Sequence, residues 1–519
     1  MKKFIPIIIL SIFLIILRIP FVSHYLFDWD AVQLAMGMDH FDISLHQPHP
    51  PGYFLYIYFA KFINIFLNNP NLAMIVENII LSIIGLIIFY KISKKIFKDE
   101  FLSILSSLIF ITNPFIWFHS EFPNVYMIDF CFSLIYFYLS YLIIIENKNL
   151  LWLFSTLLAL GIGFRQSLII FFLPIYIYTC FFNFNFSKKK ILKLLFNILI
   201  FAFVLLLWLI PNCLVMGGLD KFINISKNQF LSASKPTSIF SFAKIEALLK
   251  QFFNTTKILL YSASLLSIFS LIAIFSKKIK ISKKNSIIFL LCLLPSFLFY
   301  SFVHLGKIGY IMTISGIFMT LGIFAINKLF KERSQITIMF FIFVLQIPLF
   351  IYGIDGFIKN KIFLINVSPY DVSYLNLRNS DSRIKRTLYE IKKYNPDDTI
   401  LITEADSPYI IPKSNFIKNM RLGGYYLPEY NLYNIFNDGV KKKYYYINNK
   451  NTRLIHDFQI QIPQNTKNVL LVTDNFNYDI YDFKKYPKFE EVFYMNIENQ
   501  NEFEYIGYKF IKNQNNNHY

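Results

Sequence analysis

The chain has 519 residues, of which 55% are hydrophobic and only 16% are charged. Ordinary soluble proteins carry roughly 25% charged residues, and no soluble core absorbs 60 Phe and 34 Tyr side chains in a chain of this length. The formal net charge of +19 would suggest a nucleic-acid partner in a soluble protein. Here the lysines fall mostly in short loops between apolar runs, which is the positive-inside pattern of a membrane protein. We therefore expect a lipid bilayer as partner and no nucleic acid.

Apolar runs long enough to cross a bilayer recur along the first two thirds of the chain. The stretch 151–182 is too long for one helix, and Gly161, Gly163, Arg165 and Gln166 interrupt it. We divide it into two short helices around a polar turn, because an unpaired Arg at mid-bilayer is costly. The predicted spans then number about eleven. They lie near 4–20, 73–92, 101–117, 125–145, the two halves of 151–182, 190–211, 256–276, 286–303, 309–329 and 336–354.

The N-terminal run and the cysteines add two expectations. The apolar run from Phe4 has no small-residue cleavage site before Arg18, so we interpret it as a retained helix and not as a signal peptide. None of the four cysteines has a CxxC or metal-ligand spacing, so neither disulfides nor a zinc site is expected. They are Cys131, Cys180, Cys213 and Cys292.

Lysine clusters occupy alternate connections between the predicted spans and thereby orient the chain. The clusters are Lys2–Lys3, Lys91–Lys98, Lys188–Lys190, Lys277–Lys284 and Lys328–Arg333. These connections are predicted to be cytoplasmic. The loops 21–72, 112–124, 212–255 and 304–308, the turn at Arg165 and everything after about residue 355 then face the other side.

The tail from 355 to 519 has a different composition, since Asn, Asp, Tyr and Lys replace the long apolar runs. Its predicted elements are a charged helix from Ser382 to Lys393, a Pro-Asp-Asp turn, and strands at Thr399–Thr403, Tyr444–Ile447 and Val469–Thr473. The last residues, Asn513–Tyr519, are expected to be disordered. The predicted fold class is a polytopic α-helical membrane protein. Its transmembrane domain covers 1–354, and an extracytoplasmic α/β domain covers 355–519.

The first outer loop, 21–72, concentrates ionisable side chains. They include Asp28, Asp30, Asp39, Asp42, His46 and His49. Asp28 and Asp30 lie two residues apart in a segment apolar enough to rest on the membrane surface, and the run from Pro48 to Gly52 restricts several φ angles. A solvated acidic loop is the simpler interpretation. Restricted backbone freedom beside ionisable groups favours a preorganised site.

This layout resembles the GT-C class of membrane glycosyltransferases, which includes protein O-mannosyltransferases and the transferases that add aminoarabinose to lipid A. Members carry an acidic motif in the first outer loop, followed by a small amphipathic helix. Asp30-Ala-Val-Gln-Leu-Ala35 stands where the family has Asp-Glu-x-x-Tyr-Ala, and Asp28 gives an Asp-x-Asp variant. The second acid is missing at position 31, which leaves the base open between Asp28 and Asp30.

Further motifs resemble the same class over residues 1 to about 330. They are HPPGY (His49–Tyr53), EFPNVYMID (Glu121–Asp129), GIGFRQS (Gly161–Ser167), Pro211–Gly218 and HLGKIGY (His304–Tyr310). The resemblance implies transfer of a sugar from a polyprenyl-phosphate donor to an extracytoplasmic acceptor, which is a lipid, a glycan or a protein. A donor of this kind keeps its tail in the bilayer while its phosphate meets cations at the interface.

The resemblance also implies roles for individual residues. The attacking acceptor hydroxyl needs a carboxylate base within about 3 Å, for which we expect Asp30, or else Asp28. The leaving phosphate needs cations or hydrogen-bond donors. The candidates are Arg165, Lys307 and His304, with His49 as a further one. The tail, which has no clustered acids beside rigid Pro or Gly, is expected to recognise the acceptor through Arg421–Pro428.

Several site candidates also have structural interpretations. Arg165 fits a snorkelling cation at a helix end. His46 and His49 either brace the Pro-rich turn or belong to the site, and Glu121 fits a solvated loop acid as well as a site residue. Asp129 lies inside the fourth predicted span, where a carboxylate is expected to face protein or a polar cavity.

Other functions stay open at this point. A secondary transporter has a similar number of spans, but the sequence has no repeat of similar halves. A non-enzymatic envelope scaffold leaves the clustered acids unexplained, and a phosphotransferase or ligase with another lipid-linked donor is a further alternative. The sequence identifies no cofactor. The class includes members with and without a divalent metal, so metal use stays open. The Lys, Asn, Ile and Phe bias suggests an AT-rich genome, and hence a bacterial inner membrane with the catalytic face outside.

Overall fold

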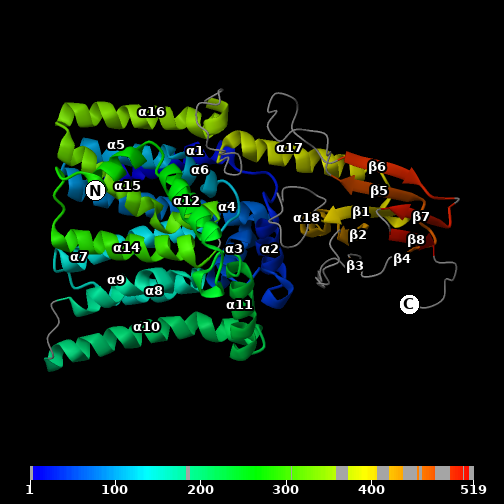
Figure 1. Ribbon diagram of the computed structural model, residues 1–519, viewed down its shortest axis with the longest axis horizontal. Helices are drawn as coiled ribbons and strands as arrows, with labels where there is room; N and C mark the ends of the chain where they lie inside the picture. Colours follow the sequence, from blue (N-terminus) through cyan, green and yellow to red (C-terminus); the bar gives the residue numbers. More distant parts are fainter. Residues whose placement is uncertain are drawn as a thin grey trace. The chain divides into compact units, whose positions relative to one another are not determined.

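Helices dominate the computed structural model, which divides into two compact units (Figure 1). The structure describes residues 4–182, 187–304, 307–357, 372–405, 420–436, 453–454, 459–473, 491–498, 500–505 and 508–512. The helical unit comprises Met1–Val22 and Pro50–Leu375, and the tail unit comprises Ser23–His49 and Asn376–Tyr519. Residues 23–49 of the predicted loop 21–72 therefore pack with the C-terminal part of the chain, whereas residues 50–72 belong to the helical unit. The domain boundary expected at residue 354 stays a prediction.

The helical unit is a bundle in which most helices run side by side (Figure 1). Its helices are α1 (Ile5–Arg18), α3 (Phe54–Leu67), α4 (Pro70–Phe97), α5 (Glu100–Thr112), α6 (Pro114–Ser120), α7 (Tyr126–Ile144), α8 (Leu151–Phe164), α9 (Leu168–Phe181), α10 (Lys188–Val215), α11 (Leu219–Ser234), α12 (Ile245–Ser262), α13 (Leu266–Phe275), α14 (Lys283–Phe302), α15 (Met312–Leu329) and α16 (Glu332–Phe357).

The sequence itself marks where several of these helices begin. Asn69 and Asn113 precede Pro70 and Pro114, and each Asn side chain accepts hydrogen bonds from backbone N–H groups of the first helical turn. An Asn N-cap followed by Pro at the first helical position is a strong start signal, because Pro lacks an N–H that would need a partner there. α6 therefore begins as a separate helix after α5, at an angle of 57° to it.

Among the described residues, six helices are long and apolar enough to cross a membrane, or up to eight if each of two bent pairs is one span. The bent pairs are α5 with α6 and α12 with α13, and the shorter apolar helices are Ile5–Phe21, Phe54–Leu67, Leu151–Phe164 and Leu168–Phe181. Each predicted apolar run contains a helix. The predicted break in 151–182 is confirmed, since α8 ends at Phe164 and α9 begins at Leu168. The count of about eleven spans stays a prediction.

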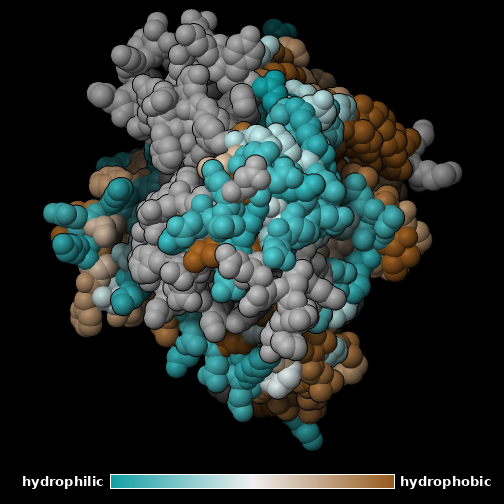
Figure 2. Space-filling model, turned by 90° about the vertical axis from the view of Figure 1, so that its right-hand side faces the viewer, coloured by the Kyte–Doolittle hydropathy of each residue, from teal (hydrophilic) through white to brown (hydrophobic). Residues whose placement is uncertain are grey.

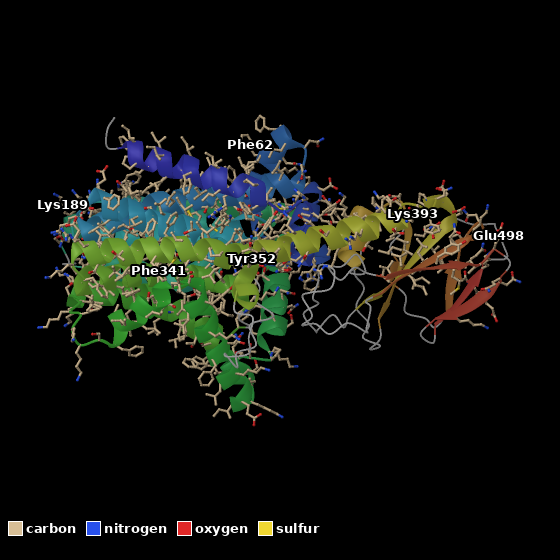
Figure 3. All side chains as sticks on the ribbon, turned by 90° about the horizontal axis from the view of Figure 1, so that it is seen from above. Phe62, Lys189, Phe341, Tyr352, Lys393 and Glu498 are labelled. Carbon is tan, nitrogen blue, oxygen red and sulfur yellow. The ribbon has the colours of Figure 1, made fainter. Side chains whose placement is uncertain are left out.

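Large hydrophobic side chains cover the outward faces of the helices. Phe62 and Phe341 are 56% and 62% exposed, and Figure 3 shows Phe62 projecting from α3. Figure 2 shows brown, hydrophobic surface beside the teal, hydrophilic surface. Lipid tails cover such a surface without the cost that water imposes. At the centre of the bundle, α15 is almost entirely buried and packs against α4, α7, α13 and α14.

The tail unit is an α/β structure, as predicted. Its helices are α2 (Trp29–Asp39), most of α17 (Tyr374–Ile391) and α18 (Met420–Tyr426). One sheet has the order β3-β2-β1-β5-β6 and the other β4-β8-β7. The strands are β1 (Thr399–Ala405), β2 (Asn431–Phe436), β3 (Arg453–Leu454), β4 (Gln459–Ile462), β5 (Asn468–Thr473), β6 (Glu491–Asn496), β7 (Glu502–Tyr505) and β8 (Tyr508–Lys512).

The larger sheet holds the core of the tail unit. β1 runs parallel to β2 and β5, whereas β6 is antiparallel to β5. Alternate residues such as Ile400, Ile402, Val469 and Leu471 point into one apolar cluster, as the period of two along a strand requires. The predicted strands at 399–403 and 469–473 and the predicted helix at 382–393 correspond to β1, β5 and α17. Tyr444–Ile447 and Asn513–Tyr519 lie outside the described residues.

Candidate active site

Arg165 lies in the polar turn between α8 and α9 and is almost completely buried. Its Nη1 is 3.1 Å from Asp129 Oδ2, and it donates a hydrogen bond to the Val125 carbonyl at 3.4 Å. Arg165 Nε donates to Ser167 Oγ at 3.3 Å. Asp129 lies in the first turn of α7 and is fully buried. A buried charge persists in an apolar bundle only with a partner, so this pair ties the α8–α9 turn to the start of α7.

Tyrosine rings surround the Arg165 guanidinium. Its carbon atom lies 5.2 Å from the ring centre of Tyr310, 5.5 Å from that of Tyr126 and 5.9 Å from that of Tyr53. Tyr300 stacks on Tyr310, with ring centres 5.1 Å apart. A guanidinium within about 6 Å of a ring is attracted to its π face. We call Arg165, Asp129, Tyr53, Tyr126, Tyr300 and Tyr310 the Arg165 cluster.

These tyrosines were not predicted as site residues from the sequence, although three of them stand in the motifs that resemble the GT-C class. Tyr53 ends HPPGY, Tyr126 lies in EFPNVYMID, and Tyr310 ends HLGKIGY. Their positions inside the motifs could have indicated a site role. The chain contains 34 tyrosines, however, so these few did not stand out. The glycine at position 309, in the last motif, is required by close packing. A Cβ there would stand 2.2 Å from the Tyr126 ring, so only Gly allows the two segments to approach.

The turn between α14 and α15 brings His304 close to the same cluster. The His304 ring stacks on Phe299 and lies edge-on to Tyr310, with ring centres 5.8 Å and 5.6 Å apart. Lys307 precedes the short 3-10 helix Ile308–Ile311, and its carbonyl accepts a hydrogen bond from the Tyr310 N–H at 3.1 Å. The structure thus places two of the predicted phosphate ligands, His304 and Lys307, on the segment that supplies Tyr310.

Glu121 belongs to a second buried ion pair. Arg18 Nε is 3.7 Å from Glu121 Oε1, and both side chains are fully buried. Arg18 also donates to the Ile111 carbonyl at 2.9 Å, and its guanidinium lies 5.0 Å from the Trp117 ring centre. These contacts fasten the end of α1 to α5 and α6. They support a structural role for Glu121. The pairing of Glu121 with Arg18 was not predicted from the sequence.

The acidic pair lies in the tail unit, at the start of α2, and its two members differ. Asp28 is the N-cap of α2, and its carboxylate accepts a hydrogen bond from the Ala31 N–H at 2.8 Å. Asp30 lies in the first turn, where the helix dipole favours a negative charge. Its Oδ1 is 3.8 Å from His49 Nδ1, and each of the two side chains is 18% exposed. Asp30 and His49 are thus together at a partly accessible position, whereas Asp28 has a capping role.

His46 lies in a tight turn of the same loop. The Asp42 N–H donates to the Gln47 carbonyl at 2.6 Å, and the Gln47 N–H donates back to the Asp42 carbonyl at 3.0 Å. His46 itself has a left-handed backbone, with φ of 58°. This placement supports the bracing role for His46. Within the described ranges, no three His, Cys, Asp or Glu side chains are grouped so that they would hold a metal ion.

The fold has relatives among solved structures. No family model matches the sequence, and no curated protein matches it. A crystal structure of ArnT from Cupriavidus metallidurans bound to undecaprenyl phosphate matches with a TM-score of 0.53, covering 91% of this chain and 93% of that one. The chain resembles ArnT in fold. The apo structure of ArnT gives a TM-score of 0.55 over 90% of this chain, and the identity is 9% in both comparisons. At that identity the similarity shows the fold alone, and the GT-C-like fold implied by the motifs is confirmed.

Proposed function

We propose that the protein is a glycosyltransferase that moves a sugar from a polyprenyl-phosphate-linked donor to an acceptor outside the cytoplasm. The observation that carries the proposal is the Arg165 cluster, a buried cation walled by tyrosines in a helical bundle. The fold adds support, because ArnT has been crystallised with undecaprenyl phosphate. A lipid-linked donor also suits a bundle with an apolar outer surface, since its tail stays in the bilayer.

Arg165 is the group that we assign to the leaving phosphate. A guanidinium has five N–H donors in a planar fork, and the contacts with Asp129, Val125 and Ser167 use its Nη1 and Nε. Its Nη2 hydrogens are the donors that we assign to a phosphate oxygen, with Lys307 and His304 as further hydrogen-bond donors. The ion pair with Asp129 fixes the orientation of the Arg165 guanidinium. Such preorganised donors stabilise charge as it develops on the leaving group.

Asp30 is the group that we assign to the acceptor. As the acceptor oxygen attacks the anomeric carbon, the bond from that carbon to the phosphate oxygen breaks, and the hydroxyl proton passes to the Asp30 carboxylate. The electron pair of the broken bond leaves with the polyprenyl phosphate. His49, 3.8 Å from Asp30, is placed to interact with the carboxylate, and Asp28 holds the first turn of the helix that presents Asp30.

The test compares sugar transfer with transport. Purified protein in proteoliposomes is given a polyprenyl-phosphate sugar with a radiolabelled sugar, together with envelope lipids, glycans or proteins as acceptors. We expect label to appear on one acceptor class and free polyprenyl phosphate to accumulate. Movement of intact donor or of a free solute across the membrane without any transfer would favour a transporter. If the protein showed neither transfer nor transport, that result would favour a scaffold. Mass spectrometry of envelope lipids and glycans with and without the protein identifies the acceptor and the sugar.

A further inference from the structure

Side chains from the C-terminal part of the chain accept hydrogen bonds from the backbone of the loop that carries Asp30. The carboxylate of Asp381, on α17, accepts hydrogen bonds from the His24 N–H at 2.9 Å and the Tyr25 N–H at 3.1 Å. The hydroxyl of Tyr426, on α18, accepts one from the Leu26 N–H at 2.7 Å. Three successive N–H groups of the loop therefore end on two side chains from the C-terminal part of the chain.

Asp381 is itself held in place. Arg378, one turn earlier on α17, donates to Asp381 Oδ2 at 2.9 Å, and the Asp381 side chain is only 8% exposed. Burial raises the pKa of the Asp381 carboxyl, and the N–H groups of His24 and Tyr25 act in the opposite direction. These donors offset part of the cost of burying a carboxylate. A carboxylate kept among backbone donors in this way is suited to fixing a loop.

We call the contacts of Asp381 and Tyr426 with the N–H groups of residues 24–26 the clasp. The clasp lies next to the acidic pair. Leu26 is buried, and two residues later Asp28 caps α2, so the position of residues 24–26 fixes where α2 begins. The other end of the loop is anchored as well. A Cβ on Gly37 would stand 2.6 Å from Pro48 Cδ, so the proline-rich run packs directly on α2. Asp30, in the first turn of that helix, is therefore held from both sides.

We propose that Asp381 is a positioning residue that holds the loop 23–49 so that Asp30 presents its carboxylate in one fixed place. The inference rests on the proposed role of Asp30 as the base. It gives the C-terminal residues a part in the chemistry beyond acceptor recognition. A displacement of about 1 Å at a catalytic group is enough to slow turnover by roughly 100-fold, so loss of the clasp is expected to lower kcat much more than donor affinity.

The fluorescence of Trp29 reports on how the loop is held. Trp29 lies between Asp28 and Asp30 and is half-buried. It is also the one tryptophan of the four in the chain that falls within the tail unit. The difference in fluorescence between each variant and the same variant with Trp29→Phe isolates its signal. Quenching of that signal by acrylamide then measures how tightly the loop is held, whether or not any sugar is transferred.

The experiment compares Asp381→Asn, Asp381→Glu and Glu390→Gln in the full-length protein. Glu390 is the matched control, because it lies on the same helix and pairs with Lys393 at the surface. Asp381→Asn is expected to raise quenching of Trp29 and to lower kcat by roughly 10- to 100-fold. Affinity for undecaprenyl phosphate alone should not change. Asp381→Glu should restore part of both properties, and Glu390→Gln should change neither.

Two outcomes overturn the inference. Unchanged quenching of Trp29 in Asp381→Asn shows that the clasp does not hold the loop, and increased quenching with a normal kcat shows that the loop position does not matter for turnover. If the wild type transfers no sugar while quenching responds as expected, the proposed function fails and the clasp stands. Tyr426→Phe, which removes only the acceptor for the Leu26 N–H, repeats the test if Asp381→Asn does not fold.

Discussion

Replacing Arg165 tests whether this residue serves the donor or only the fold. Arg165→Ala leaves Asp129 fully buried without its partner. Removing one member of a buried ion pair typically costs about 3–5 kcal/mol of unfolding free energy. Reduced donor binding by this variant alone would therefore be uninformative, because part of the protein would be unfolded. A second substitution that removes the unpaired Asp129 carboxylate separates the effect on stability from the effect on donor binding.

The double variant Arg165→Met/Asp129→Leu is expected to recover most of that stability, since apolar side chains of similar volume often replace a buried pair at little cost. It should not recover donor binding. A hydrogen bond to a charged group is worth about 1.5–3 kcal/mol, which corresponds to a rise of roughly 10- to 150-fold in the Kd for undecaprenyl phosphate. Arg165→Lys should bind with intermediate affinity, because it keeps the charge and loses the planar fork.

The other buried pair supplies the control. Arg18→Met/Glu121→Leu removes an equally buried ion pair without touching the Arg165 cluster, so its donor affinity should equal that of the wild type. Thermal unfolding in detergent measures stability, and calorimetric titration with undecaprenyl phosphate measures Kd. If Arg165→Met/Asp129→Leu bound undecaprenyl phosphate as tightly as this control, Arg165 would have a structural role alone.

Three further predictions concern the acidic pair, the tyrosines of the Arg165 cluster and the orientation of the chain. Asp30→Asn should reduce turnover by roughly 10²- to 10⁴-fold with donor binding intact. Asp28→Asn should have a smaller effect, because Asn also caps a helix; comparable kcat values for the two variants would contradict this assignment. Gly309→Ala, whose new methyl group would overlap the Tyr126 ring, should weaken undecaprenyl phosphate binding. Normal affinity would show that the packing of tyrosines in the Arg165 cluster is not needed for donor binding. A cysteine at Asn431 should react with an impermeant maleimide in intact cells, and labelling only after permeabilisation would reverse the predicted orientation.

The sequence by itself determined most of the apolar helices of the bundle and their order, whereas α3 and α11 lie in the segments 21–72 and 212–255 that were predicted as loops. Membrane helices satisfy their backbone groups internally, so an apolar run of sufficient length predicts a helix whatever surrounds it. The break at Arg165 was predictable for the same reason, since a charged side chain interrupts such a run. The strands at 399–403 and 469–473 were also visible, because buried parallel strands are short and continuously apolar.

The tertiary structure decided which of these elements meet. Arg165 and Asp129 lie 36 positions apart, and Asp381 lies more than 350 positions from His24, so no local pattern relates the members of either pair. The partners of Arg165 and Asp381 depend on how helices and loops pack, whereas periodicity reports only what each segment does alone. The difference between Asp28 and Asp30 was hidden for the same reason. Both are acids at the start of one helix, and only the folded backbone shows which of them caps it and which lies beside His49.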